Sequence, residues 1–192
     1  MECNKFSQLF EKYGSDKTKS RYNYFYYEII SQNKINYITE IGMGTNNIKI
    51  PSNMGAGGKP GASLRAFSEY MPNCKIYGAD IDKKILFQDK NITTFFINQL
   101  DIESILKFKS EIPKMDLIID DGLHLPDANL NIIHNLIDHL NKDGFLIVED
   151  IENIFLDIFL IVKDSINAKK NFRSQLIQDN NNKGLLIIKR IQ

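Results

Sequence analysis

Four short apolar runs in this 192-residue chain each end on carboxylate side chains. The runs cover residues 37–40, 76–80, 117–121 and 146–150. Continuous apolar runs bounded by polar turns are typical of strands that are buried on both faces of a parallel sheet. The carboxyl ends of parallel strands share one edge, where open α/β sheets bind their ligands. The pattern therefore predicts a parallel sheet with an acidic site along one edge.

Strand-like and helix-like segments alternate along most of the chain. Strand patterns cover residues 36–41, 75–81, 93–98, 115–120 and 145–148, and helical patterns fall near 62–71 and 153–168. Two last runs, 173–178 and 185–189, are joined by a polar link that predicts a hairpin turn. This order predicts a mostly parallel sheet with an antiparallel edge.

We expect one domain, because the sequence contains no internal repeat and no change of composition along its 192 residues. Residues 1–35 form an N-terminal helical or lid segment in this interpretation, and residues 36–192 form the core. The helical pattern at 5–33 is broken at 13–17, and an aromatic cluster follows at 22–28. The cluster either packs onto the sheet or forms a lid or substrate wall, and its aromatic side chains are also candidates for a homo-oligomer contact.

Charge and cysteine content argue against several classes of protein. Lysines and arginines equal aspartates and glutamates in number, so nothing indicates the basic stripe of a nucleic-acid-binding protein. The longest apolar stretch, 154–162, is interrupted by Asp157 and is too short to cross a membrane. Cys3 and Cys74 lack metal-type spacing, and no signal peptide is evident at the start. We therefore expect a reduced, cytoplasmic protein.

A glycine-rich turn follows the first predicted strand. Gly42 and Gly44 would let the backbone pass close to a ligand, although such a pair also occurs in plain strand-to-helix turns. The dinucleotide fingerprint requires a third glycine where Asn47 stands, and no P-loop string occurs. Asp80 ends the second strand, where an acid commonly accepts the hydroxyls of a ligand ribose. A surface aspartate in a turn is the alternative for Asp80.

Residues 120–124 and 149–150 indicate a functional site more strongly than the glycine-rich turn and Asp80 do. Paired acids end both strands, and His124 lies three positions after Asp121. Carboxylates that converge without lysines nearby repel one another unless a cation lies among them, and magnesium prefers such oxygen ligands. A metal would lower the pKa of a bound hydroxyl, and His124 could accept its proton. Loop acids and a structural histidine are the alternatives, and structural roles are also expected for His134 and His139.

The ordered set of motifs resembles the class I S-adenosylmethionine-dependent methyltransferases, and among them the metal-dependent sugar O-methyltransferases of macrolide biosynthesis. The matching segments are 13–17, 39–44, 61–65, 72–82, 98–101, 120–124 and 148–150. The resemblance implies a Rossmann-like, doubly wound α/β fold with a mostly parallel seven-stranded sheet and an antiparallel C-terminal hairpin. Two departures are Leu123, where the family usually has serine, and the lack of room for the extra N-terminal domain of the larger macrolide enzymes.

The resemblance also implies roles for individual residues. Glu40, Gly42 and Gly44 would cradle the methionine part of S-adenosylmethionine. Asp80 would bind its ribose, and Gln99 with Asp101 would lie near the adenine. Ser63 and Asp120 complete the expected cofactor set. Asp121, Glu149 and Asp150 would bind Mg²⁺, and His124 beside Asp121 would be the catalytic base.

The function expected from the sequence is therefore methylation of a hydroxyl on a sugar or similar polyol, with Mg²⁺ and S-adenosylmethionine as cofactors. The expected partner is a small-molecule acceptor rather than a nucleic acid or a membrane. Two alternatives stay open. A non-catalytic cofactor-binding protein would be indifferent to EDTA. A nicotinamide-dependent oxidoreductase on the same sheet is disfavoured by Asn47 and by the acids of the later strands.

Overall fold

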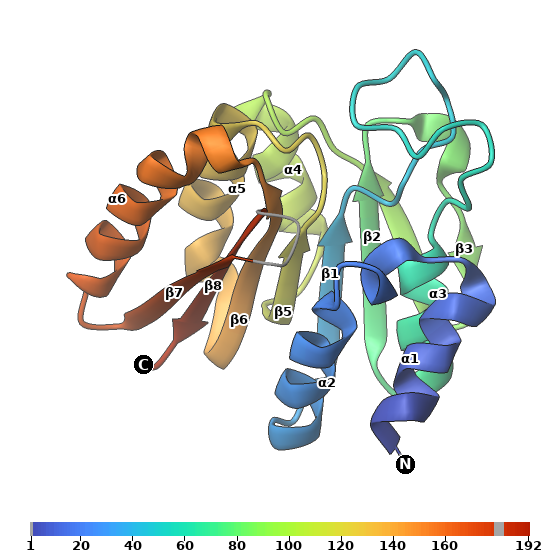
Figure 1. Cartoon of the computed structure of the whole chain (residues 1–192), viewed down its shortest axis with the longest axis horizontal. Helices are drawn as coiled ribbons and strands as arrows, with labels where there is room; N and C mark the ends of the chain where they lie inside the picture. The colour runs from blue at the N-terminus through green and yellow to red at the C-terminus, as the bar shows by residue number, and fades with distance from the viewer. Residues whose placement is uncertain (1, 179–182) are drawn as a thin grey trace.

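The computed structural model describes residues 2–178 and 183–192, and within these ranges the strands form one eight-stranded sheet (Figure 1). The strand order is β3-β4-β2-β1-β5-β6-β8-β7. The strands are β1 Tyr37–Ile41, β2 Lys75–Asp80, β3 Gln88–Asp89, β4 Ile92–Phe96, β5 Met115–Asp120, β6 Leu140–Ile151, β7 Phe172–Gln178 and β8 Gly184–Arg190.

The pairing confirms the predicted mixture of parallel and antiparallel strands. Strands β4, β2, β1, β5 and β6 are parallel to their neighbours in this series, whereas β8 pairs antiparallel with both β6 and β7. The strand order reverses between β1 and β5, which is the position where open α/β sheets bind ligands. The link that joins β7 to β8 was predicted as a hairpin turn, and residues 179–182 of it lie outside the described residues.

Two features of the sheet differ from the sequence prediction. The two-residue strand β3 pairs antiparallel with β4, and both of its residues are exposed, so it has no apolar pattern by which it could be detected. Strand β6 begins at Leu140 rather than at 145. Residues 141–143 of β6 are polar and at least partly exposed, and the register of β6 against β5 shifts between Met115 and Leu117.

Three helices cover each face of the sheet (Figure 1). One layer consists of α1 Glu2–Tyr13, α2 Tyr22–Gln32 and α3 Ala62–Tyr70, and the other of α4 Ile102–Glu111, α5 Pro126–Leu136 and α6 Leu156–Asn167. The short 3₁₀ helices are η1 Asp16–Thr18, η2 Lys83–Ile85, η3 Ile137–His139 and η4 Asn153–Phe155.

Strand β5 shows why the predicted strands are continuously apolar. All six of its residues are buried. Ile118 packs into the core cluster of α4, α5 and α6, whereas Leu117 and Ile119 pack into the cluster of α1, α2 and α3. Successive side chains of a strand point to opposite faces, so a strand covered on both faces needs apolar residues at nearly every position.

The aromatic side chains near the N-terminus belong mainly to the core. Phe6 and Phe10 of α1 and Tyr22 and Tyr26 of α2 are buried, whereas Tyr24 is 53% exposed. This arrangement confirms that the cluster packs onto the sheet, with Tyr24 as its exposed member. The predicted break in the helical pattern is confirmed by η1, which Ser15 caps by accepting a hydrogen bond from the backbone of Lys17.

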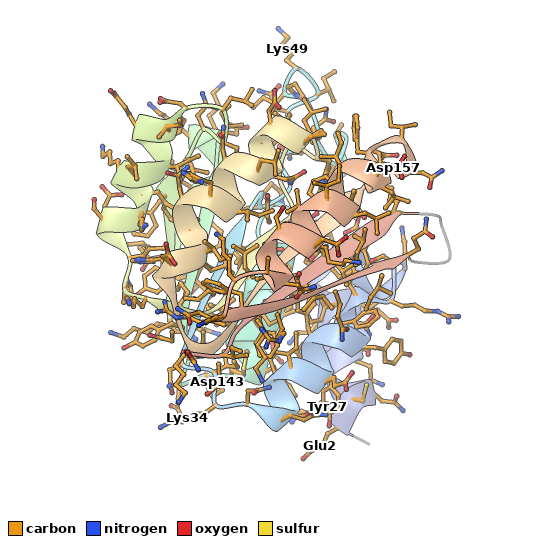
Figure 2. The ribbon with its side chains drawn as sticks, turned by 90° about the vertical axis from the view of Figure 1, so that its left-hand side faces the viewer. Glu2, Tyr27, Lys34, Lys49, Asp143 and Asp157 are labelled. Carbon is orange, nitrogen blue, oxygen red and sulfur yellow. The ribbon has the colours of Figure 1, made fainter. Side chains whose placement is uncertain are left out.

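The surface of the molecule carries its charged residues in a scattered manner. Lys34, Lys49, Asp143 and Asp157 all point away from the body of the protein (Figure 2). Among residues 2–178 and 183–192, no helix is both long enough and apolar enough to cross a membrane.

Candidate functional site

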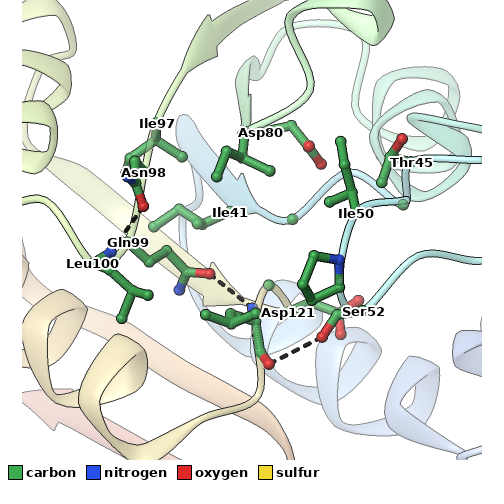
Figure 3. A pocket seen from close by; sticks show the side chains of 16 residues that line it. Ile41, Thr45, Ile50, Ser52, Asp80, Ile97, Asn98, Gln99, Leu100 and Asp121 are labelled. Atoms are coloured by element: carbon green, nitrogen blue, oxygen red, sulfur yellow. Dashed lines mark hydrogen bonds between the residues drawn. The ribbon is translucent and has the colours of Figure 1, made fainter. Parts of the chain in front are cut away.

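The ends of β1, β2 and β5 open onto two neighbouring pockets at one edge of the sheet. We call the first pocket the slot. It lies between residues 97–100 and residues 45–52, with Ile97 to Leu100 facing Thr45, Ile50 and Ser52 (Figure 3). We call the second the acidic pocket, because Glu40, Asp121 and Asp150 are part of its wall. The two pockets share Gly42, Gly44, Ser52 and Asp121.

Gly42 allows β1 and β5 to pass close to each other at the base of both pockets. Its φ is +87°, and a Cβ atom there would lie 2.1 Å from the backbone oxygen of Asp121. The backbone NH of Gly42 donates to Ala79, and that of Asp121 donates to Ile41, each at 2.8 Å. Only glycine fits this conformation and this contact, so the sequence signal at Gly42 reflects a real steric need.

Asp80 lies in the wall of the slot, as predicted. Its carboxylate accepts hydrogen bonds from the backbone NH groups of Met43 and Asp82, both at 2.8 Å. Burial raises the pKa of Asp80, and the two backbone donors offset this only in part. The carboxylate is therefore held in one orientation at the position where a ribose would be expected.

Gln99 lines the slot, and Asp120 holds it in place. The fully buried carboxylate of Asp120 accepts hydrogen bonds from Gln99 Nε2 at 2.7 Å and from Asn129 Nδ2 at 2.8 Å. Gln99 Oε1 in turn accepts from the backbone NH of Leu123. Burial raises the pKa of Asp120 despite its two donors. Asp120 was predicted to contact the cofactor, but the structure places it behind Gln99.

Asp101 also differs in position from the expectation. It is exposed at the start of α4, where its side chain accepts a hydrogen bond from the backbone NH of Glu103. This contact makes it the N-cap of α4. The slot is lined on this side by Asn98, Gln99 and Leu100 instead.

Glu40 and Ser63 meet in the acidic pocket. Glu40 is 1% exposed, and one of its carboxylate oxygens accepts a hydrogen bond from the Ser63 hydroxyl in the first turn of α3. Its other oxygen lies 3.1 Å from the ammonium group of Lys17. Burial raises the pKa of Glu40, whereas Lys17 lowers it. The expected cofactor residues Glu40 and Ser63 are therefore adjacent, and both line the pocket.

Lys17 is a buried residue of the site that the sequence analysis did not single out. Its side chain is only 2% exposed, and its Nζ lies 2.7 Å from Asp121 Oδ2 and 2.8 Å from Glu149 Oε1. Burial alone would lower the pKa of Lys17, but Asp121, Glu149 and Glu40 raise it well above its usual value. The acids were expected to converge without a lysine nearby. That expectation was wrong, because Lys17 is 104 residues from Asp121 in the sequence.

Glu149 is directed toward this lysine. Both of its carboxylate oxygens accept hydrogen bonds from Lys17, and one also accepts from the hydroxyl of Tyr26. Burial and the nearby Asp121 raise the pKa of Glu149 well above its usual value, although Lys17 and Tyr26 act in the opposite direction. The metal-binding role predicted for Glu149 would require one of its oxygens to be shared with these donors.

Asp121, His124 and Asp150 form a group with metal-ligand spacing. One potential ligand atom from each lies within 4.8 Å of those of the other two. His124 Nε2 is 3.8 Å from Asp121 Oδ1, and His124 Nδ1 is buried without a hydrogen-bond partner among the described residues. His124 and Asp150 both have a left-handed backbone, with φ of +56° and +54°. Such conformations in residues other than glycine cluster at functional sites.

Asp150 is held by side chains from two other segments. Tyr22 donates to its Oδ1 at 3.0 Å, and Lys183 donates to its Oδ2 at 2.9 Å. Although burial raises the pKa of Asp150, its contacts with Lys183, His124 and Tyr22 bring it below the usual value. The lowered pKa favours the ionised carboxylate that a metal ligand requires.

Two lysines and four carboxylates meet in this region. Lys17 contacts three carboxylates, those of Glu40, Asp121 and Glu149, and Lys183 contacts Asp150. Burial raises the pKa of Glu40 and Glu149, whereas the contacts of Asp150 bring its pKa below the usual value. Magnesium and calcium prefer carboxylate oxygens, so Asp121 and Asp150 suit such an ion.

The sequence is similar to O-methyltransferases of Streptomyces. The chain is 29% identical over 99 residues to 8-demethyl-8-alpha-L-rhamnosyl tetracenomycin-C 2'-O-methyltransferase of Streptomyces olivaceus. The matched residues are 52% of this chain and 26% of that protein. It is 30% identical over 91 residues to demethylmacrocin O-methyltransferase of Streptomyces fradiae, covering 47% and 23%. The matched part thus spans about a quarter of each relative. No family model matches the chain.

The fold is similar to that of a methyltransferase from mycinamycin biosynthesis. The structure of MycE in complex with Mg, SAH and mycinamycin VI superposes with a TM-score of 0.75 at 20% sequence identity, covering 97% of this chain and 54% of that one. The likeness shows that the chain has the Rossmann-like fold of the class I S-adenosylmethionine-dependent methyltransferases. The predicted fold class and the resemblance to the macrolide-sugar enzymes are both confirmed.

Proposed function

We propose that this chain is an S-adenosylmethionine-dependent O-methyltransferase that uses a divalent cation to methylate a hydroxyl of a sugar or similar polyol. The proposal rests chiefly on one observation: a slot suited to a nucleoside and an acidic pocket with a candidate cation site share the wall at Gly42, Gly44 and Asp121. Both named relatives are O-methyltransferases, and the name of one includes a rhamnosyl group, which supports the same type of reaction.

The slot and its rim would hold the cofactor. Asp80 would accept the ribose hydroxyls, and Gln99 with the apolar side chains of Ile81 and Leu100 would contact the adenine, since all four line the slot. Ile81 is 48% exposed and Leu100 is 55% exposed, and a bound base would cover this apolar surface. Glu40 and Ser63, on the acidic side, would hold the methionine part, so that the methyl group lies toward Asp121 and His124.

The acidic pocket would hold the acceptor. Asp121 and Asp150 would bind the cation, with Glu149 as the third predicted ligand. A divalent cation bound there lowers the pKa of a coordinated hydroxyl and fixes its orientation. His124 would accept the hydroxyl proton, since its imidazole lies beside Asp121 and has a buried Nδ1 with no partner among the described residues. Methyl transfer is an in-line displacement, so the remaining task of the pocket is to position the two reactants.

Calorimetric titration with S-adenosylmethionine and S-adenosylhomocysteine is the first test of this proposal. We expect both to bind, because Asp80, Gln99 and Glu40 are already held in place by hydrogen bonds. Turnover of glycoside acceptors, followed by release of S-adenosylhomocysteine, should require Mg²⁺ and stop on addition of EDTA. Binding of neither compound would contradict the proposal. Binding without any effect of EDTA on turnover would exclude the role of the cation, and binding of NAD⁺ in their place would favour an oxidoreductase.

The cation site has its own prediction. Asp121→Asn and Asp150→Asn should each weaken Mn²⁺ or Mg²⁺ binding by at least about tenfold, because each removes a charged oxygen ligand. Asp101→Asn is the matched control. It makes the same change at the exposed cap of α4, where asparagine caps equally well. Titration of the three variants with the metal, in the presence of S-adenosylhomocysteine, measures the effect. Equal affinity in all three would contradict this assignment.

A further inference from the structure

Lys17 lies between the two halves of the proposed site. Its Nζ is 3.1 Å from Glu40 Oε1 on the cofactor side, and 2.7 Å and 2.8 Å from Asp121 Oδ2 and Glu149 Oε1 on the cation side. An ammonium group has three donor hydrogens, and here three carboxylates surround it. The side chain therefore contacts acids from the ends of three strands, β1, β5 and β6.

The N-terminal segment holds Lys17 in this position from behind. Lys17 belongs to η1, which joins α1 to α2, and the Ser15 side chain caps η1 by accepting from the Lys17 backbone NH. Tyr26 of α2 donates its hydroxyl to Glu149, and its ring lies 5.9 Å from Lys17 Nζ. Tyr26 is itself buried against Phe67 of α3. The lysine is therefore fixed by the packed helical layer and not by a mobile surface loop.

These contacts also set which carboxylate oxygens remain for a ligand. Lys17 takes Oδ2 of Asp121, and Oδ1 is the oxygen that faces His124 at 3.8 Å. On the cofactor side, Lys17 contacts Oε1 of Glu40 while Ser63 donates to Oε2. One ammonium group thus orients an acid in each half of the site.

We propose that Lys17 is a positioning residue that joins the cofactor half of the site to the cation half, so that the N-terminal segment is an integral wall of the site. The inference rests on the proposed function and goes beyond it, because it gives a residue of the N-terminal segment a part in binding both ligands. Replacing Lys17 removes the common partner of Glu40, Asp121 and Glu149, and leaves buried carboxylates without compensation.

The test compares Lys17→Met with Lys19→Met by titration with S-adenosylhomocysteine in metal-free buffer and by thermal unfolding. We expect Lys17→Met to weaken binding by about tenfold or more, as is typical when a hydrogen bond to a charged group is lost, and to lower the melting temperature. Lys19 is exposed at the rim of the same pocket. Lys19→Met should therefore match the wild type in both measurements.

A double variant separates positioning from simple charge balance. Lys17→Met with Glu149→Gln removes one buried positive and one buried negative charge, so the melting temperature should recover most of its loss. S-adenosylhomocysteine binding should stay weak, because Glu40 still lacks its partner. The double variant also carries the test if Lys17→Met does not fold.

Three outcomes are informative. Weak S-adenosylhomocysteine binding by the folded double variant supports the positioning role. The positioning role is overturned if either folded variant binds S-adenosylhomocysteine with an affinity within about twofold of the wild type, a much smaller loss than expected. Lys17 would then serve stability alone. Failure of the wild type to bind S-adenosylhomocysteine would instead contradict the proposed function, which keeps the two conclusions distinguishable.

Discussion

His124→Ala should lower kcat by about 10²–10⁴-fold while leaving the affinity for S-adenosylhomocysteine unchanged, since this range is typical for the loss of a general base. A sugar hydroxyl is a poor nucleophile at neutral pH, and His124 Nε2 lies 3.8 Å from Asp121 Oδ1 in the wall of the acidic pocket. The cofactor is expected in the slot and around Glu40, and His124 is not among the residues that line the slot. The effect should therefore appear in the chemical step and not in cofactor binding.

The backbone conformation of His124 requires a second variant. Its φ of +56° lies in the left-handed region, which asparagine tolerates better than most residues. His124→Asn should keep this backbone and still lose turnover. His134→Asn is the matched control, because His134 is exposed on α5. Turnover is followed as release of S-adenosylhomocysteine with an acceptor that the wild type uses. Normal turnover in His124→Ala would exclude the base role.

Gly42→Ala should destabilise the protein by about 3 kcal/mol or more and abolish S-adenosylhomocysteine binding. Such a cost is typical of a steric clash combined with a strained backbone. The new Cβ would lie 2.1 Å from the Asp121 backbone oxygen and 2.5 Å from Gly122 Cα, at a φ of +87°. Since both contacts are with backbone atoms, β1 and β5 would have to separate at the point where the slot meets the acidic pocket.

Gly57→Ala supplies the control for this prediction. Gly57 also lines the acidic pocket, but an added Cβ would meet no atom within 4 Å. The Gly57→Ala substitution should change the free energy of unfolding of the protein by no more than about 0.5 kcal/mol, as is usual for surface substitutions. Urea denaturation and calorimetric titration measure both variants. If the Gly42→Ala protein had the same urea denaturation midpoint as the wild type, the strands would have adapted to the added Cβ, contrary to the steric argument.

The fold was predictable because its signals are local. A strand buried on both faces must be apolar along most of its length, and β5, which is buried at all six positions, is apolar at four of them. The glycine at position 42 marks a close approach that no other residue allows. The short strand β3 was not predictable, because its two exposed residues carry no such pattern.

The candidate site was only partly predictable. The sequence places acids at the ends of parallel strands, and the shared edge of the sheet brings Glu40, Asp80 and Asp121 into the walls of two adjacent pockets. The sequence does not show which of the acids faces a ligand. Asp120 lies behind Gln99, and Asp101 caps α4, although both belong to the same motifs as residues that line the slot.

By itself, the sequence determined the type of sheet, the edge at which the acids gather, and the need for positive charge among them. Only the tertiary structure decided where part of that charge comes from. Lys17 reaches Asp121 and Glu149 across 104 and 132 residues of sequence, because the helical layer of α1 and α2 packs against the sheet beside them. Local patterns record the period and burial of each element, whereas an ion-pair cluster depends on how separate elements meet in space.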